Sequence, residues 1–286
     1  MTLKITFFDV QHGNATYIKT PNGTHILHDL GTGTLNNNTE FSPVHYLKNQ
    51  NVDRLNYLII SHPHKDHIED ILNIDMINPS VFTRPIIPSS FLNDSIKNAN
   101  ADDEKIYRKY IDISNKYTGN VNPETDPGDS KNNGGVNIET FKASGDDTDL
   151  NYYSLVTLIS YGGAKILLTG DNNPKSINEL MENSSFTSKT ENIDILLTPH
   201  HGRKSSYVSK FVKHLNPILT IISDKKDDEN KELSAVNSYS KNSRGFNVHH
   251  NTGSKERFCL TTRQDGTITT QFSNGNGERF LHVSTN

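Results

Sequence analysis

The chain has 286 residues, a formal net charge of −4, thirteen histidines and one cysteine. The single cysteine excludes a disulfide framework and a cysteine-rich zinc or iron–sulfur site, so any bound metal would depend on imidazole and carboxylate ligands. The mildly acidic balance argues against a protein that coats nucleic acid without sequence preference, because such a protein needs a basic surface.

Short strands and turns fill the first 90 residues. Apolar runs at 3–10, 15–20 and 24–31 are separated by turn residues, among them Gly13 and Gly23, a pattern typical of strands. Residues 42–50 predict a helix, because Pro43 suits a first helical turn. The apolar run at 55–61 predicts a strand that leads directly into a histidine-rich loop, and another short segment follows at 81–87.

A long polar region separates this half from the next. It spans about residues 89–149, with a predicted helix at 102–117 and a surface loop at 117–135. The second half predicts a hairpin at 152–171, a helix at 173–183, a strand at 192–202, a helix at 205–215 and a strand at 217–223. A charged run at 224–232, a further helix and a closing hairpin at 257–272 complete it.

The two halves share one order of elements. Strand, loop and helix alternate in both, which predicts an α/β fold: a four-layer αββα sandwich of two mixed sheets with helices on the outer faces. Because motifs in both halves have to converge on one site, we expect a single domain over residues 1–286, with the polar region as an insertion. No stretch approaches the roughly 18 uninterrupted apolar residues of a membrane span, and the first residues lack the pattern of a signal peptide. We therefore expect a soluble cytoplasmic protein.

The segment Ser-His-Pro-His-Lys-Asp-His at 61–67 is the strongest chemical signal. His62 and His64 are two residues apart in extended backbone, so they project to one side, while Asp66 and His67 enter the next helix and face a neighbouring point. One short loop can therefore serve two adjacent cations. Imidazole and carboxylate ligands suit Zn²⁺, with Mn²⁺ or Fe²⁺ as alternatives.

This segment resembles the H-x-H-x-D-H signature of the metallo-β-lactamase-fold superfamily. The resemblance implies that Asp171, at the end of LLTGD, bridges two metals, and that His201 of LLTPHHG is the last imidazole ligand, with His200 beside it. Asp29 of HDLGTG would orient a metal-bound histidine. The chain is also similar over about residues 3–270 to the branch that contains the hydrolase domain of the DNA-uptake protein ComEC and the phosphorylcholine esterase-like enzymes. The metal ligands implied in this way are His62, His64, Asp66, His67, Asp171 and His201.

Several positions depart from that branch. Residues 9–14 read DVQHGN where DVGQGD is usual, and Arg203 replaces the serine expected after His-His-Gly. No histidine lies between His67 and His200, so the extra imidazole that many members use on the first metal is missing. Asp147, Asp149, Asn151 or water are the candidates to complete that site, and a single bound metal is an alternative.

Further candidates surround the ligand set. Asp9 and His12 follow the first strand and could line the cleft, whereas local turn bonding explains Asn14 equally well. Arg203 and Lys204 could bind a phosphate, since Arg does so bidentately. The substrate-contacting or supporting candidates are Asp9, His12, Asp29, Asn151, Arg203 and Lys204.

The sequence therefore predicts a metal-dependent hydrolase, a phosphodiesterase or nuclease that uses a hydroxide bound to two divalent metal ions, with zinc the preferred metal. The candidate catalytic residues are Asp66, His200 and Asp171. The expected substrate is a phosphodiester, either DNA, RNA or a small nucleotide. The alternatives are a non-catalytic metal-containing subunit that binds a partner protein in a multi-gene system, and a carbon-ester or lactone hydrolase.

Overall fold

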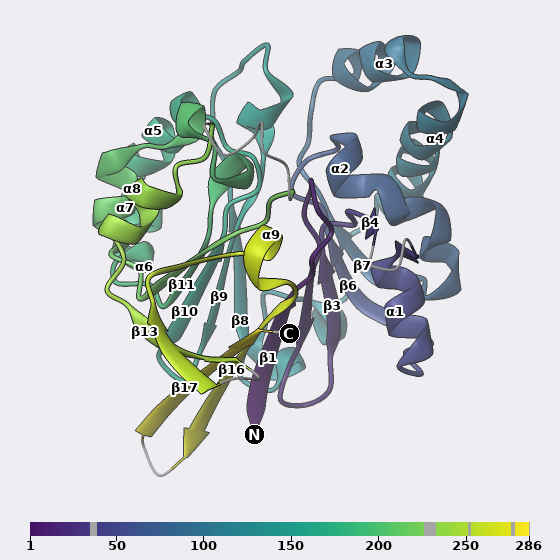
Figure 1. The fold of residues 1–286 in the computed structure, drawn as a ribbon. Coiled ribbons are helices and arrows are strands. Elements are labelled where there is room, and N and C mark those ends of the chain that lie inside the picture. Colours follow the sequence, from purple (N-terminus) through teal and green to yellow (C-terminus); the bar gives the residue numbers. More distant parts are fainter. Residues whose placement is uncertain (35–38, 226–232, 251–252, 276–277, 286) are drawn as a thin grey trace.

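The computed structural model describes residues 1–34, 39–225, 233–250, 253–275 and 278–285. Two β-sheets lie face to face between two groups of helices (Figure 1). This arrangement confirms the predicted four-layer α/β sandwich. No helix in these ranges is both long and apolar enough to cross a membrane. The charged run at 224–232 lies mostly outside the described residues, and the extent of the domain stays a prediction.

The first sheet has nine strands in the order β14-β13-β17-β16-β1-β2-β3-β6-β7. Their bounds are β1 Thr2–Phe7, β2 Thr16–Lys19, β3 His25–His28, β6 Leu55–Ile59, β7 Pro79–Thr83, β13 Phe246–His250, β14 Gly253–Arg257, β16 Ile268–Gly275 and β17 Glu278–Thr285. The sheet is mixed: β1 and β2 pair antiparallel, whereas β3, β6 and β7 run parallel. A two-stranded ribbon of β4 (Gly33–Thr34) and β5 (Glu40–Phe41) lies apart from it.

The second sheet has six strands in the order β15-β12-β11-β10-β9-β8. Their bounds are β8 Asn137–Phe141, β9 Val156–Tyr161, β10 Ala164–Leu168, β11 Ile195–Leu197, β12 Leu219–Ile222 and β15 Cys259–Thr261. Strands β10, β11, β12 and β15 run parallel, whereas β8 and β9 are antiparallel. The parallel strands therefore all end at one edge of the sheet.

Helices cover the outer face of each sheet (Figure 1). Their bounds are α1 Pro43–Asn49, α2 Lys65–Ile68, α3 Ser89–Asn98, α4 Ala101–Lys116, α5 Pro174–Glu182, α6 Ser184–Thr190, α7 Ser209–Leu215, α8 Val236–Lys241 and α9 Thr262–Asp265. Short 3₁₀ turns complete the helical segments, among them η1 (Glu69–Met76), η4 (Leu150–Tyr153) and η5 (Pro199–Gly202). Helices α1 to α4 lie on the side of the first sheet and α5 to α8 on the side of the second.

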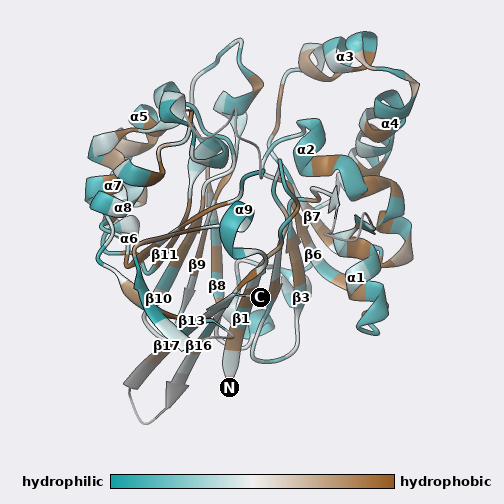
Figure 2. Ribbon diagram, viewed as in Figure 1, coloured by the Kyte–Doolittle hydropathy of each residue, from teal (hydrophilic) through white to brown (hydrophobic). Residues whose placement is uncertain are grey.

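Alternating side chains on the strands form three apolar layers. Ile5 and Ile59 of the first sheet meet Ile166 and Ile221 of the second in the central layer. The opposite faces pack against helices, for example Leu58 with α4 and Leu167 with α7. Apolar residues accordingly concentrate on the central strands in Figure 2. Burial of these faces is the main force that holds the layers together.

The closing hairpin predicted at 257–272 is wrong. Strand β15 pairs with β12 in the second sheet, while β16 pairs with β1 in the first, so the chain crosses between sheets here. The turn-like residues between them form α9, which is capped by the Thr261 hydroxyl accepting from the Gln264 N–H. The hairpin is one strand later, between β16 and β17.

Two elements of the polar region were not expected from the sequence. Strand β8 forms the edge of the second sheet, and only its Ile138 is buried, which leaves a weak pattern. Helix α3 has no buried side chain. The predicted helix at 102–117 corresponds to α4, whose Ile106, Tyr110 and Ile113 are buried.

The single cysteine provides a test of the packing. Cys259 is buried at the start of β15, and burial raises the pKa of its thiol to about 12. At pH 8 only about one thiol in 10⁴ would therefore be ionised. We expect native protein to resist iodoacetamide and denatured protein to react within minutes, as measured by mass spectrometry. Rapid alkylation of the native chain would show that β15 is not packed as described.

Candidate metal centre

Loops at the carboxyl ends of strands position every residue of the site. The loop 61–67 follows β6, Asp171 follows β10, and His200 and His201 follow β11 in η5. Parallel strands bring these ends to one edge of each sheet, and the two edges meet in the sandwich. This edge is where open α/β sheets commonly bind ligands.

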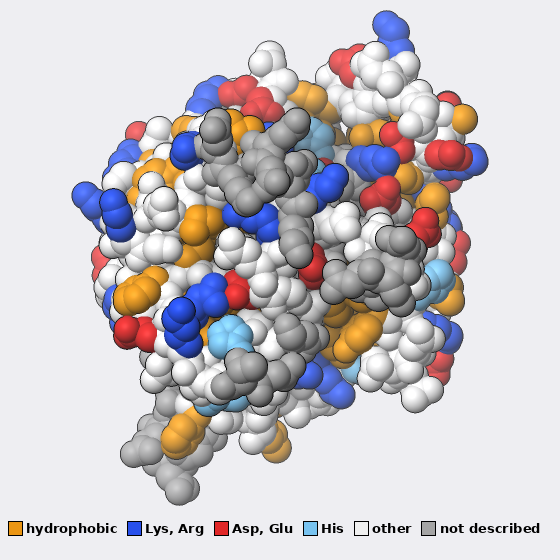
Figure 3. Space-filling model, viewed as in Figure 1, with side chains coloured by type: hydrophobic (Ala, Val, Ile, Leu, Met, Phe, Trp, Pro, Cys, Tyr) orange, Lys and Arg blue, Asp and Glu red, His pale blue; other side chains and the backbone are white. Residues whose placement is uncertain are grey.

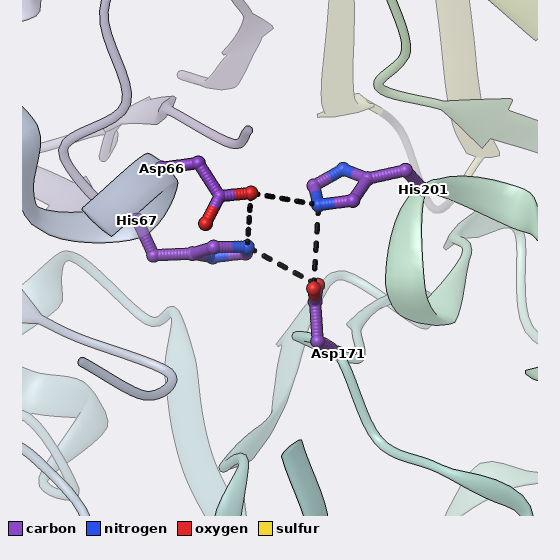
Figure 4. A group of neighbouring side chains, drawn as sticks. All are labelled: Asp66, His67, Asp171 and His201. Atoms are coloured by element: carbon purple, nitrogen blue, oxygen red, sulfur yellow. Dashed lines mark ion pairs between the residues drawn. The ribbon is translucent and has the colours of Figure 1, made fainter. Parts of the chain in front are cut away.

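Two carboxylates and two imidazoles form a compact group (Figure 4). Ligand atoms of Asp66, His67, Asp171 and His201 all lie within 4.8 Å of one another. The His67 Nε2 atom is 3.1 Å from Asp171 Oδ1, and His201 Nε2 is 3.3 Å from Asp171 Oδ2 and 3.2 Å from Asp66 Oδ2. His67, Asp171 and His201 are buried, whereas Asp66 is partly exposed.

The donor atoms suit a divalent cation. The Nε2 atoms of His67 and His201 are buried and make no hydrogen bond of proper geometry, although carboxylate oxygens lie close to both. Buried imidazole nitrogens normally have a partner. Two such nitrogens that face two carboxylates are the kind of donor set that holds Zn²⁺ or a similar ion. The residues therefore fit the group that the sequence predicts.

His62 and His64 lie next to this compact group. The His62 Nε2 atom is 2.9 Å from His64 Nδ1 and 4.0 Å from Asp171 Oδ2. His62 is fully buried. Asp171 is thus within reach of both histidine sets, which is the placement that a carboxylate shared by two cations requires.

In the metal-free chain, the pKa of His62 shifts in the opposite direction to the pKa values of His67 and His201. Burial lowers the pKa of His62 well below its ordinary value, and neighbouring His67 lowers it further. Burial also opposes charge on His201, but Asp171 and Asp66 outweigh it and raise the pKa of His201 to about 10. The pKa of His67 is raised for the same reason, chiefly by Asp171 and Asp29 against the effect of burial. A cation that takes this position would displace protons.

Asp29 fixes the orientation of His67. Its Oδ2 atom is 2.8 Å from His67 Nδ1, and its carboxylate also accepts from the Ser61 N–H, the Ser61 hydroxyl and the Asn14 amide. Burial disfavours the ionised carboxylate, but His28 and His67 outweigh it and hold the pKa of Asp29 at about 2. Asn14 therefore supports the site instead of making only local turn bonds.

The backbone of η5 assigns different positions to the two adjacent histidines. His200 and His201 both have left-handed backbone, with φ of 49° and 53°. His201 points into the compact group, and its Nδ1 atom is 3.1 Å from the Ser223 carbonyl oxygen. His200 Nε2 is 4.0 Å from Asp171 Oδ2, and its Nδ1 atom is 2.9 Å from the Ser206 hydroxyl. The structure thus includes His201, and not His200, in the compact group.

The remaining candidates lie around this group. The His12 ring is 4.7 Å from the His201 ring, and its Nε2 atom is 3.7 Å from Asp66 Oδ2. Arg203 and Lys204 follow η5, and the positive charge of Arg203 contributes to the lowered pKa of His12, after burial and His201. Asn151 is buried, and its Oδ1 atom has no partner among the described residues. Asp9 accepts from the Gln11 N–H in a local turn.

Three serines support the site and were not singled out as site residues from the sequence. Ser61 donates to Asp29, and the Ser154 hydroxyl accepts from the Asp171 N–H. Ser223 holds His201 through its carbonyl and donates its hydroxyl to the Gly13 carbonyl at 2.7 Å. Ser61 and Ser223 each follow an Ile-Ile pair at a strand end, which is the one signal that could have pointed to both.

Gly13 allows the first loop to approach Asp66. Its φ is +115°, and an added Cβ would lie 2.3 Å from the Asp66 carbonyl oxygen. We expect Gly13→Ala to displace Asp66 and lower metal affinity about 10-fold or more, measured by competition with a chelating dye.

Gly163→Ala is the matched control. Gly163 has φ of +82°, but nothing lies within 4 Å of an added Cβ. Backbone strain of about 1–2 kcal/mol should therefore affect both variants, and only Gly13→Ala should lose metal affinity. Equal affinities in the two variants would show that Gly13 does not position Asp66.

Comparison with known proteins gives similarities in fold. No family model matches the sequence, and no curated protein matches it. Among solved structures, the chain is similar to the metallo-β-lactamase fold protein YhfI from Bacillus subtilis (13% identity, TM-score 0.45, covering 82% of this chain and 93% of that one). It is also similar to CmlA, a diiron β-hydroxylase from Streptomyces venezuelae (14%, 0.45, 78% and 44%), and to a diphosphatase from the PhnP family (10%, 0.40, 80% and 90%). The ComEC-like branch stays a prediction.

Proposed function

We propose that the chain is a metal-dependent hydrolase that cleaves a phosphodiester. The observation that carries the proposal is that Asp171 lies within 4.0 Å of His62, which contacts His64, and also within 3.3 Å of His67 and His201. Two divalent cations, with zinc preferred, would share Asp171 in this arrangement. When bound, such ions polarise a phosphoryl oxygen and make water a stronger nucleophile at neutral pH.

The chain's own residues bind and orient the reacting groups. Asp29 and Ser223 hold the rings of His67 and His201 through their Nδ1 atoms, so that both Nε2 atoms would be available to hold a cation. Arg203 follows η5 at the same strand end and can bind an unreacting phosphate oxygen. Asp66 belongs to the compact group, so its role is that of a ligand.

His200 is the candidate to protonate the leaving group. Its Nε2 atom faces Asp171, and its Nδ1 atom lies beside the Ser206 hydroxyl. Donation from that hydroxyl to Nδ1 would place the ring proton on Nε2. His200 is only partly buried, so a substrate can reach it. When Nδ1 also carries a proton and donates to Ser206 instead, the ring is an imidazolium that can pass its Nε2 proton to the departing oxygen and return to the neutral form.

Metal analysis followed by a substrate panel tests the proposal. Purified protein would be assayed on bis-p-nitrophenyl phosphate, a p-nitrophenyl carboxylate ester and a lactone. We expect metal-dependent turnover of the phosphodiester, lost in His64→Ala and retained in His249→Ala, which removes an exposed histidine of β13. Bound metal without turnover of any of these would favour a binding role, and turnover of only the ester or lactone would contradict the phosphodiesterase assignment.

A further inference from the structure

A buried polar pair joins the two sheets beside the metal centre. His28 is the last residue of β3 in the first sheet, and Thr157 lies near the start of β9 in the second. The His28 Nε2 atom is 3.2 Å from the Thr157 hydroxyl oxygen, and both side chains are fully buried. Histidine side chains that reach the surface appear as separate pale-blue patches in Figure 3, whereas this histidine is an internal link between the sheets.

The surroundings of the pair are apolar. In the strand register, His28 is paired with Ile59 of β6 and Thr157 with Leu168 of β10, and both neighbours belong to the central apolar layer. A polar pair at such a position has a desolvation cost that apolar side chains of similar size would not have. The packing of the two sheets therefore does not by itself account for a histidine here.

The same two neighbours show where the pair lies along the strands. Ile59 and Leu168 are the last residues of β6 and β10, so the loops that carry the metal-ligand candidates begin just after them. The loop after β6 supplies His67 from the first sheet, and the loop after β10 supplies Asp171 from the second. A bond between the sheets at this level therefore constrains how the two groups of ligands lie relative to each other.

The other ring nitrogen of His28 faces a residue that supports the metal centre. The His28 Nδ1 atom is 3.5 Å from Asp29 Oδ2, and the same oxygen is 2.8 Å from His67 Nδ1. The His28 Nδ1 atom is buried and makes no hydrogen bond of proper geometry with the residues that the structure describes. When His28 Nε2 accepts from the Thr157 hydroxyl, the ring proton of a neutral His28 is on Nδ1, toward the carboxylate. Close polar contacts thus lead from Thr157 through His28 and Asp29 to His67.

We propose that His28 is a positioning residue for the metal centre. Held by Thr157 of the second sheet, its ring fixes the carboxylate of Asp29, and Asp29 in turn orients His67. This inference rests on the proposed function, of which it uses the metal centre and not the substrate. His28 acts through Asp29, so its removal should weaken metal binding without exposing the site.

Replacing both members of the pair by apolar residues tests the inference. The double variant His28→Leu with Thr157→Val leaves neither partner of the His28–Thr157 bond unpaired, so its urea midpoint should stay close to that of the wild type. We expect its affinity for Zn²⁺, measured by competition with a chelating dye, to fall about 10-fold or more. The visible spectrum of bound Co²⁺, which reports ligand geometry, should change as well.

A second histidine–hydroxyl pair on the same sheet provides the matched control. His25 of β3 lies with its Nδ1 atom 2.6 Å from the Tyr17 hydroxyl, and its ring stacks on the Tyr17 ring. The double variant His25→Leu with Tyr17→Phe removes the same kinds of group away from the metal centre. It should leave both the Zn²⁺ affinity and the Co²⁺ spectrum unchanged.

Two amide variants separate the contacts of the His28 ring. An asparagine amide nitrogen can replace Nδ1, toward Asp29, whereas a glutamine amide nitrogen can replace Nε2, toward Thr157. We expect His28→Asn to keep the Zn²⁺ affinity within about 3-fold of the wild type and His28→Gln to lose about 10-fold. This comparison also decides the case in which the double variant loses stability, because rescue by asparagine alone supports positioning.

The possible outcomes separate this inference from the proposed function. Wild-type Zn²⁺ affinity in the His28→Leu, Thr157→Val variant, or equal losses in His28→Asn and His28→Gln, would overturn the role of His28 alone. A wild-type chain that binds Zn²⁺ but hydrolyses no phosphodiester would overturn the proposed function and leave the role of His28 standing. A wild-type chain that binds no divalent cation would overturn both.

Discussion

Asp171→Asn should abolish hydrolysis and remove metal from both sides of the centre. The substitution keeps the shape of the side chain and the bond from the residue 171 N–H to Ser154, so the fold is expected to persist. It removes a negative charge that lies within 4.0 Å of both His62 and His201. Loss of a bound cation costs several kcal/mol of transition-state stabilisation, so we expect kcat/KM to fall by about 10³-fold or more.

Metal content distinguishes this residue from its neighbours. His64→Ala and His201→Ala each remove a ligand on one side of Asp171, so each should lose about half of the bound metal, whereas Asp171→Asn should lose most of it. Elemental analysis of the purified variants measures this directly, with exposed Asp112→Asn as the control. Full metal content in Asp171→Asn would show that the carboxylate is not shared.

Local patterns made the metal loop and its position at a strand end predictable. The H-x-H-x-D-H spacing lies within seven residues, and an apolar strand precedes it, so neither depends on distant contacts. The alternation of strands and helices likewise predicted the layers. Asp171, at the end of an apolar strand, was identified through the family resemblance, and the structure brings it within 3.1 Å of His67 across more than 100 residues of sequence.

Features that depend on pairing between distant strands were not predictable. Ser223 supports His201 only because β11 and β12 are parallel neighbours in the sheet. The order of strands also explains why residues 257–272 do not form a hairpin, since β15 extends the second sheet and β16 belongs to the first. The choice between His200 and His201 depends on two successive left-handed residues, a conformation that is uncommon for any residue other than glycine and that the local sequence does not signal.

Asp29→Asn should weaken both metal binding and the fold. The carboxylate of Asp29 accepts from Ser61 and Asn14 and lies beside His67 Nδ1, all in buried surroundings. An amide has one acceptor oxygen, and its NH₂ group would face donors that are already there. Each buried donor left without a partner costs about 1–3 kcal/mol, so the free energy of unfolding should fall by at least that amount.

The same substitution tests how the support of His67 acts on the metal. Without the carboxylate, the His67 ring loses the partner that fixes its orientation, and we expect metal affinity to fall about 10-fold to 100-fold. Urea unfolding of the metal-free protein and dye competition measure the two effects separately. Asp53→Asn is the control, because Asp53 is exposed and pairs with Lys48 at the surface, so it should change stability by less than about 0.5 kcal/mol. A stable Asp29→Asn protein with unchanged metal affinity would mean that packing alone orients His67. Reduced stability with unchanged affinity would assign Asp29 to the fold, and only a loss of both supports its role in the site.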